Sequence, residues 1–271
     1  MSDKVDFVEG SHGIAFIEGP STALSWLTIL PIKGASAFDR ITGRRVICSV
    51  PFVGMVYGLL AALVIATGVA LGTSALLIAV LAVVAMELFG RFMHLDGLGD
   101  VADALGSYAQ GEKARSILSD PHIGLIGAGA GLLSLLAQVA SISALISSEL
   151  PFWQLMLAVI AGPSIGRLGV LFVCHNRYAP MRPGGFGAQI IGTVLTWHIV
   201  AWLLGYALLF ALIALISLGL ATALLLTLVL VAVAGALLAA HCNRRFEGLN
   251  GDCCGFVIHL CTTIALVLLA M

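Results

Sequence analysis

Charged side chains are scarce in this chain of 271 residues. Asp, Glu, Lys and Arg make up 10% of it, whereas soluble globular proteins average about a quarter. The net charge is −1, so no basic surface points to nucleic acid, and we expect no nucleic-acid partner. The six cysteines include no CxxC pair, which argues against a disulfide framework. Near the start, Asp3, Asp6 and Glu9 outnumber Lys4, unlike the basic beginning of a secretory signal.

Apolar residues take the place of the missing charge: they make up 60% of the chain, and its mean hydropathy is +1.09. They form runs near the roughly 20 residues that cross a bilayer as a helix. We therefore predict an all-α, polytopic integral membrane helix bundle embedded in the lipid bilayer. About seven transmembrane helices are expected, at 51–72, 75–93, 124–146, 151–173, 190–215, 219–240 and 254–271.

Two stretches need separate treatment. Residues 194–240 are too long for one crossing, and we divide them near Ser217–Gly219. Residues 14–32 are apolar but contain Glu18, Gly19 and Pro20, so we expect an interfacial or re-entrant segment there. We treat 1–24 as an N-terminal extension and 25–271 as a single membrane-embedded domain.

Basic residues occur only in alternate connections. They lie before the first span (Lys33, Arg40, Arg44, Arg45), after the second (Arg91, Lys113, Arg115), after the fourth (Arg177, Arg182) and after the sixth (Arg244, Arg245). The connections 72–75, 147–150 and 216–218 contain none. Because Lys and Arg gather on the cytoplasmic side, we expect the N-terminus inside and the C-terminus outside. We therefore expect a multi-pass protein of the cytoplasmic (inner) membrane whose polar clusters face the cytoplasm. The bare outer connections favour an enzyme over a transporter.

Three aspartates stand out in this uncharged background. Asp96, Asp100 and Asp103 are spaced i, i+4 and i+7, which places three carboxylates on one face of a helix. No Lys or Arg on that stripe neutralises them, and Gly97 and Gly99 leave room beside them. Mg²⁺ prefers oxygen ligands and commonly joins carboxylates to a diphosphate. We therefore predict a Mg²⁺ site; a solvated acidic helix face is the alternative.

Neighbouring ionisable groups have competing interpretations. Glu87 precedes Arg91 by four residues, which predicts an ion pair on a continuous helix. His94 shares the side of Glu87 and could act as a base only if the helix bends or unwinds near Gly97.

Two arginines are candidates for binding phosphate. Arg115 lies in a short amphipathic segment expected to end before Asp120-Pro121, and an exposed surface arginine is the alternative. Arg167 lies inside the fourth span, where an Asp of the cluster, a substrate phosphate or snorkelling to the interface would satisfy it.

The remaining polar residues lie in two later connections. His175, Asn176, Arg177 and Arg182 follow the fourth span, and Asn250 and Asp252 lie in a Gly-rich turn before the last span. Asp252 is a fourth candidate carboxylate, with a plain turn as its alternative. A zinc site formed by His241, Cys242, Cys253 and Cys254 is disfavoured, because adjacent donors rarely reach one tetrahedral centre.

Four motifs together resemble the cobalamin synthase family, in family order from about residue 25 to the end. The most specific is His94-Leu95-Asp96-Gly97-Leu98-Gly99-Asp100-Val101-Ala102-Asp103, and the others are Asp120–Gly124, His175–Ala179 and Gly248–Asp252. The chain departs from the family pattern at Pro121-His122, where the family has Ser-Arg, and at Asn250, where it has Thr. The first departure weakens a role for that loop.

The resemblance implies an enzyme that joins adenosylcobinamide-GDP to α-ribazole, or its 5′-phosphate, and releases GMP with the help of Mg²⁺. It implies Asp96, Asp100 and Asp103 as metal ligands, and the base stays open among Asp120, Asp252 and His94. We assign Arg115, Arg167, His175, Arg177 and Asn250 to substrate binding. A homo-oligomer is compatible with these features. Alternatives are a CDP-alcohol phosphotransferase, an aspartate-rich prenyltransferase or, from another class, a transporter.

Overall fold

The computed structural model describes residues 10–271, and every regular element within that range is an α-helix. The first nine residues of the predicted extension lie outside the described residues. The helices are α1 (Ala15–Leu27), α2 (Arg40–Ala70), α3 (Ala75–Phe89), α4 (Met93–Gly106), α5 (Gly111–Leu118), α6 (Leu125–Ser147), α7 (Phe152–Arg167), α8 (Gly169–Val173), α9 (Phe186–Ile190), α10 (Thr196–Ala214), α11 (Leu218–Phe246) and α12 (Gly251–Leu269).

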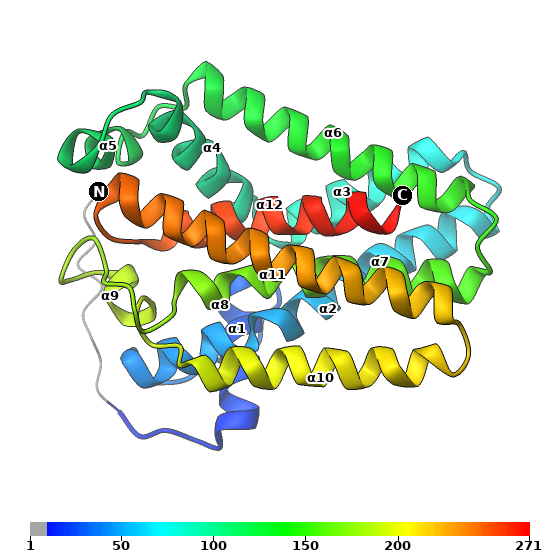
Figure 1. Ribbon diagram of the computed structural model, residues 1–271, viewed down its shortest axis with the longest axis horizontal. Coiled ribbons are helices and arrows are strands. Elements are labelled where there is room, and N and C mark those ends of the chain that lie inside the picture. The colour runs from blue at the N-terminus through cyan, green and yellow to red at the C-terminus, as the bar shows by residue number, and fades with distance from the viewer. Residues whose placement is uncertain (1–9) are drawn as a thin grey trace.

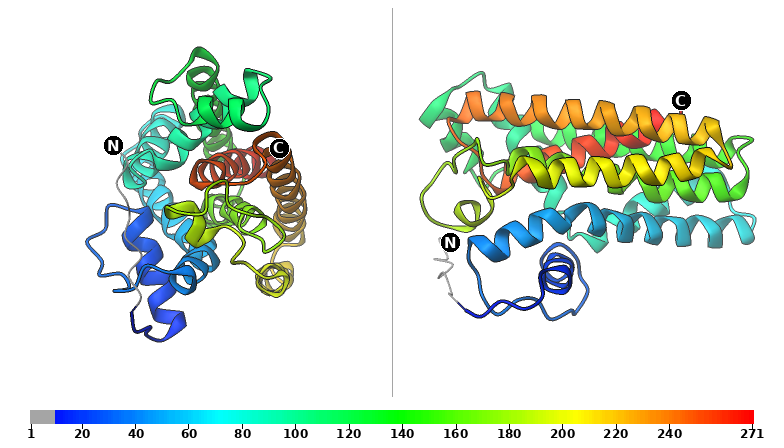
Figure 2. Two further views of the ribbon diagram at one scale, coloured as in Figure 1. Left: turned by 90° about the vertical axis from the view of Figure 1, so that its left-hand side faces the viewer. Right: turned by 60° about the horizontal axis from the view of Figure 1, so that its bottom comes forward.

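The long helices run side by side along the longest axis of the molecule (Figures 1 and 2). Six are long and apolar enough to cross a membrane, with α7 and α8 counted together. In the most apolar 18-residue stretches of α12 and of α7–α8, 72% of the stretch is buried inside the protein. In the corresponding stretch of α10 the share is 17%. The predicted polytopic helix bundle is therefore confirmed, with α12 and α7–α8 at its centre and α10 at its outside.

The remaining crossing is broken. α3 and α4 together pass the same test of length and hydropathy, but they are bent by 89° where they meet. Arg91 and Phe92 both have φ of 56°, a left-handed conformation that a helix cannot contain. The predicted Glu87–Arg91 ion pair is wrong because of this break. Arg91 instead donates to the Trp26 carbonyl at 2.5 Å, and a Glu87 carboxylate oxygen lies 3.6 Å from Nδ1 of His259.

α2 begins eleven residues earlier than the apolar run at 51–72 predicts. The Asp39 carboxylate accepts hydrogen bonds from the amides of Ile41 and Thr42, so it caps the helix before its apolar part. Arg44 and Arg45 consequently lie on the second turn of a long helix and not in a loop.

The predicted interfacial segment forms α1, which lies across the long helices (Figures 1 and 2). Arg45 of α2 pairs with Glu18 of α1 at 2.7 Å, which ties the two helices together. The side chains of Ile14, Phe16 and Ile17 at the start of α1 are 69%, 92% and 66% exposed. Such an apolar, outward-facing stretch suits contact with lipid.

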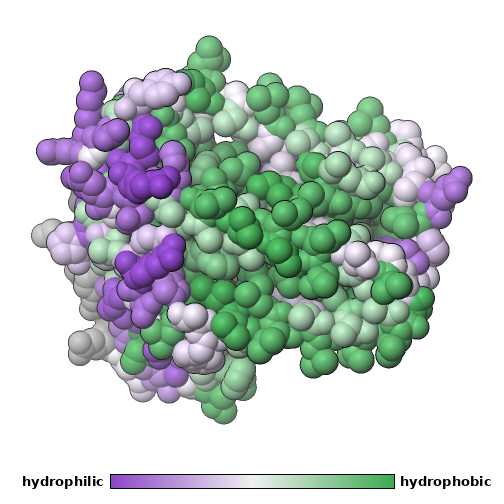
Figure 3. All heavy atoms as spheres, viewed as in Figure 1, coloured by the Kyte–Doolittle hydropathy of each residue, from purple (hydrophilic) through white to green (hydrophobic). Residues whose placement is uncertain are grey.

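Hydrophilic side chains gather at one end of the bundle, and apolar ones cover the middle of the face in Figure 3. This polar end contains α5, α9, the start of α2 and the connections 106–124, 174–195 and 246–250. All the predicted site residues except Arg167 come from α4, from α5 or from these connections and their borders. The polar chemistry of the protein is therefore concentrated at one end.

Candidate active site

The site is built where α4 crosses α12. A Cβ atom placed on Gly97 would lie 2.8 Å from the carbonyl oxygen of Asp252, and one on Gly255 would lie 3.3 Å from the Cα of His94. Only glycine permits two helix backbones to approach this closely. The crossing therefore places the start of α12 directly against the acidic helix.

Four carboxylates lie near this crossing and influence one another electrostatically. Asp100 interacts electrostatically with Asp96, Asp103 and Asp252, and Asp252 also interacts with Asp96. Asp252 lies in the first turn of α12, where its carboxylate accepts a hydrogen bond from the Asn250 side chain at 2.6 Å. Asn250 itself caps α12 by accepting from the Cys253 amide. The structure thus places Asp252, the fourth candidate carboxylate of the sequence, within electrostatic range of Asp96 and Asp100 on α4.

Asp103 differs from the other members. Its two carboxylate oxygens accept hydrogen bonds from the amides of Gly124 at 2.6 Å and Gly127 at 2.8 Å, at the beginning of α6. A carboxylate at the N-terminus of a helix accepts hydrogen bonds from the free backbone amides and interacts favourably with the helix dipole. Asp103 therefore joins α4 to α6, whereas Asp96 and Asp100 have no protein hydrogen-bond donor to their side chains among residues 10–271.

A pocket of 370 Å³ opens beside Asp252 at the polar end. Its polar lining residues are Arg115, Ser119, Arg182, Asn250 and Asp252, and its other walls include Phe186 and the glycines at 184, 185 and 187. Arg182 donates to the Ser119 hydroxyl at 3.3 Å. Two guanidinium groups and a carboxylate thus face one cavity.

Arg115 is already engaged on one side. It donates to the Phe246 carbonyl at 3.0 Å and lies 3.5 Å from a Glu247 carboxylate oxygen, at the end of α11. Within residues 10–271, Arg182 makes one side-chain hydrogen bond, the 3.3 Å contact with Ser119, so it is the less engaged of the two arginines. The sequence identified Arg182 as a residue of this connection but did not single it out. Its signal was its place in an Arg-Pro-Gly-Gly run, which forms an open loop.

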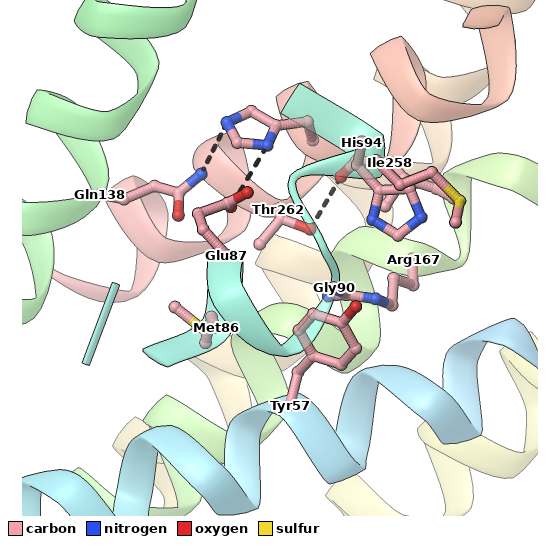
Figure 4. A pocket seen from close by; sticks show the side chains of 11 residues that line it. Tyr57, Met86, Glu87, Gly90, His94, Gln138, Arg167, Ile258 and Thr262 are labelled. Atoms are coloured by element: carbon pink, nitrogen blue, oxygen red, sulfur yellow. Dashed lines mark hydrogen bonds and ion pairs between the residues drawn. The ribbon is translucent and has the colours of Figure 1, made fainter. Parts of the chain in front are cut away.

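Two predicted residues lie in a separate, buried pocket further inside the bundle (Figure 4). The Arg167 guanidinium lies 3.6 Å from the centroid of the Tyr57 ring and donates to the Pro163 carbonyl. Its Nε has no partner among the described residues, and the side chain is 4% exposed. His94 lines the same pocket, near Glu87. This pocket shares no lining residue with the one beside Asp252, so Arg167 and His94 do not line the pocket that holds Arg115 and Arg182.

The same buried pocket contains a pair that sequence reasoning missed. His259 lies on α12 two turns beyond Asp252, and its ring contacts Glu87, Gln138 and the Ser134 hydroxyl, at 3.6, 3.2 and 2.9 Å. No local pattern reveals this contact, because Glu87 and His259 are far apart in the sequence and meet only through packing.

The other predicted residues lie around the polar end. The His175 ring lies 3.0 Å from the Thr196 hydroxyl and accepts a hydrogen bond from the Arg177 amide. Partial burial, together with the Arg177 charge, lowers the pKa of His175. Arg177 lies over the Tyr178 ring. The Asp120 carboxylate accepts a hydrogen bond from the His122 amide and lies 2.9 Å from Nδ1 of the His122 ring. These hydrogen bonds lower the pKa of Asp120. None of the three lines the pocket beside Asp252.

Neither predicted metal set forms a closed cage. No three His, Cys, Asp or Glu side chains within residues 10–271 converge closely enough to hold a metal ion by themselves. The disfavoured zinc set is also divided by other contacts, since Cys254 pairs with Cys174, with the sulfur atoms 3.7 Å apart. Any ion at the α4–α12 crossing would need ligands from outside the protein.

A multi-pass helix bundle with its carboxylates and arginine-lined pocket at one end defines a membrane-embedded enzyme. The comparisons name its class. The sequence model described as cobalamin-5-phosphate synthase matches residues 19–270. The chain therefore belongs to the cobalamin-5-phosphate synthase family and is a transferase of cobalamin synthesis.

The names of individual relatives agree with this family assignment. The chain is 45% identical to an adenosylcobinamide-GDP ribazoletransferase of Corynebacterium diphtheriae and 43% identical to one of Corynebacterium efficiens, over all of this chain and 98% of each relative. It is 34% identical to one of Pseudomonas paraeruginosa, over 92% of this chain and 96% of the relative. The corynebacterial alignments include the N-terminal 24 residues, although the family match begins at residue 19. No solved structure matches the chain.

Proposed function

We propose that this enzyme transfers the phosphorylated corrinoid of adenosylcobinamide-GDP to α-ribazole, or to its 5′-phosphate, and releases GMP. The observation that carries the proposal is the pocket beside Asp252. It brings Arg115 and Arg182 together with Asp252, which interacts electrostatically with Asp96 of α4. Arginine binds phosphate oxygens in a bidentate way, so the pocket suits a nucleotide diphosphate. The names of the relatives point to the same substrates.

The residues at the crossing fit Mg²⁺. Asp96 and Asp100 supply only oxygen ligands, and neither has a hydrogen-bond donor among residues 10–271 that would compensate its charge. Mg²⁺ is usually held by one or two carboxylates together with substrate phosphates and water, not by a cage of protein groups. When bound, it would neutralise the charge that develops on the diphosphate oxygens.

The protein groups have separate tasks in this reaction. Arg182 and Arg115 would hold the guanosine phosphate. The 3′ hydroxyl of the ribazole sugar attacks the phosphorus that carries the corrinoid, and the bond from that phosphorus to the GMP oxygen breaks. Asp252 is the favoured acceptor for the hydroxyl proton, because it alone of the three candidate bases lines the pocket. Asn250 fixes the orientation of the Asp252 carboxylate.

The orientation is part of the proposal. We place the polar end at the cytoplasmic side of the inner membrane, where Lys and Arg gather and where nucleotide substrates are available. The start of α2, the helix α5 with Arg115, the connection with Arg177 and the last turn of α11 with Arg244 all lie at this end.

Substitution of Asp100 by Asn tests the catalytic assignment. The purified variant in lipid, given Mg²⁺, adenosylcobinamide-GDP and α-ribazole, should release GMP at least ~100-fold more slowly, a size typical of losing transition-state charge stabilisation. Glu112→Gln removes an exposed carboxylate from α5 at the same end and should retain the wild-type rate. GMP release by the Asn variant at close to the wild-type rate would remove Asp100 from the site.

A further inference from the structure

A third cavity lies between α1, α2 and α10. Its volume is 730 Å³, within the range of small-molecule sites. Its apolar lining includes Phe16, Pro20, Phe52, Ala201 and Trp202. It shares no lining residue with the pocket beside Asp252. We call this cavity the α1–α10 groove.

The walls of the α1–α10 groove are held by specific contacts. The Trp202 indole on α10 donates to the Cys48 carbonyl of α2 at 2.8 Å. On the other side, Arg45 of α2 pairs with Glu18 of α1. A Cβ atom on Gly19 would lie 3.0 Å from the Arg45 carbonyl oxygen, so α1 and α2 touch backbone to backbone. The groove is therefore a preformed feature of the fold.

One of its two arginines has no hydrogen-bond or ion-pair partner among residues 10–271. The Arg45 charge is balanced by Glu18. Arg44, which also lines the groove, has no hydrogen bond or ion pair within residues 10–271, although it is only half-exposed. An uncompensated charge beside the hydrocarbon is costly, so a membrane protein usually supplies an anion for it.

The surroundings point to a lipid as the source of that anion. Trp197 stacks on His198, with ring centroids 3.8 Å apart, and is 62% exposed beside the groove. Tryptophan is enriched at the level of the lipid headgroups. On α1, the exposed side chain of Ile17, next to the lining residue Phe16, continues the apolar surface beyond the groove.

We propose that the α1–α10 groove binds an acidic glycerophospholipid. The lipid phosphodiester pairs with Arg44, and an acyl chain lies along Phe52, Ala201 and Trp202. The charges favour an acidic lipid over a zwitterionic one. With Arg45 neutralised, the groove has one spare positive charge, which balances one phosphodiester. The additional ammonium of a zwitterionic headgroup would face two guanidinium groups. This site would tie α1 to the membrane and does not depend on the proposed reaction.

Native mass spectrometry of the purified full-length protein in non-ionic detergent tests the site. Phosphatidylglycerol should remain bound at concentrations at which phosphatidylcholine does not. Arg44→Gln should weaken retention of phosphatidylglycerol about tenfold or more, the size of a lost charge-assisted hydrogen bond. Arg244→Gln is the matched control, because it removes an exposed arginine from the last turn of α11, at the same end but outside the groove. It should bind phosphatidylglycerol as the wild type does.

A second variant keeps the charge and fills the space. Ala201 is exposed on α10 and lines the groove, so Ala201→Trp should block the acyl chain while Arg44 stays in place. It should also lose phosphatidylglycerol. Equal retention of both lipids, wild-type binding by either groove variant, or equal losses in the Arg44 and Arg244 variants would overturn the proposal. Displacement of phosphatidylglycerol by equimolar inorganic phosphate would overturn it as well, since it would mean an anion site without a lipid chain.

Discussion

At the scale of single residues, the carboxylates of α4 have unequal roles despite their common spacing. Asp96 and Asp100 have no protein donors to their side chains among the described residues, whereas two backbone amides of α6 hold Asp103. Asp252, from the other end of the sequence, completes the group beside the arginine-lined pocket. A position on a shared helix face therefore does not establish a shared function.

Asp103→Ala should lower stability as well as activity. Removing this cap leaves the Gly124 and Gly127 amides without their acceptor, and losing a helix cap costs about 0.5–2 kcal/mol. We expect a lower midpoint of thermal unfolding in lipid nanodiscs, whereas Asp100→Asn should unfold at the wild-type temperature. Equal midpoints for the Asp103 variant and the wild type would show that Asp103 does not stabilise the start of α6.

At the scale of elements, the break between α3 and α4 decides where the acidic helix points. Two successive non-glycine residues, Arg91 and Phe92, adopt left-handed backbone conformations, which cost of order 1–3 kcal/mol each. The contacts of Arg91 with Trp26 and of Glu87 with His259 hold this turn from outside. The bend turns α4 across α12 and brings Asp96 and Asp100 to Asp252.

Gly97→Ala tests the crossing of α4 and α12. The new methyl group would lie 2.8 Å from the Asp252 carbonyl, so the helices must separate and the carboxylates with them. We expect a loss of GMP release of about tenfold or more, as small misplacements commonly cost this much or more.

Gly129→Ala is the control for that variant, because a Cβ atom at Gly129 of α6 meets nothing within 4 Å. The control should keep full activity and gain slightly in stability, as Ala suits helices better than Gly. Full activity of the Gly97 variant would mean that the close approach is not needed for the reaction.

At the scale of the whole molecule, polar groups are concentrated at one end and the opposite connections are short. An active site at the polar end can receive soluble nucleotides without a path through the bilayer. The α1–α10 groove shares no residue with that site, so the two proposals can be tested separately.

Thiol labelling can measure the orientation. Five of the six native cysteines are buried and Cys48 is half-buried, so an added exposed cysteine should react first. In intact spheroplasts, a membrane-impermeant maleimide should label Glu149→Cys, between α6 and α7, but not Glu112→Cys on α5. After permeabilisation both should react. The reverse pattern in intact spheroplasts would place the polar end outside.

Composition and local periodicity were enough to predict the bundle, most of its spans and the acidic helix. Those features depend on residues that are neighbours in the sequence. The predicted division at Ser217–Gly219 agrees with the end of α10 at Ala214 and the start of α11 at Leu218. The segment predicted to end before Asp120 is α5, which ends at Leu118. Only the tertiary structure decided which residues meet. The bend at Arg91–Phe92, the capping role of Asp103 and the partnership of α4 with Asp252 arise from contacts between segments distant in sequence. Those contacts depend on how the helices pack, and the hydropathy along the chain does not predict them.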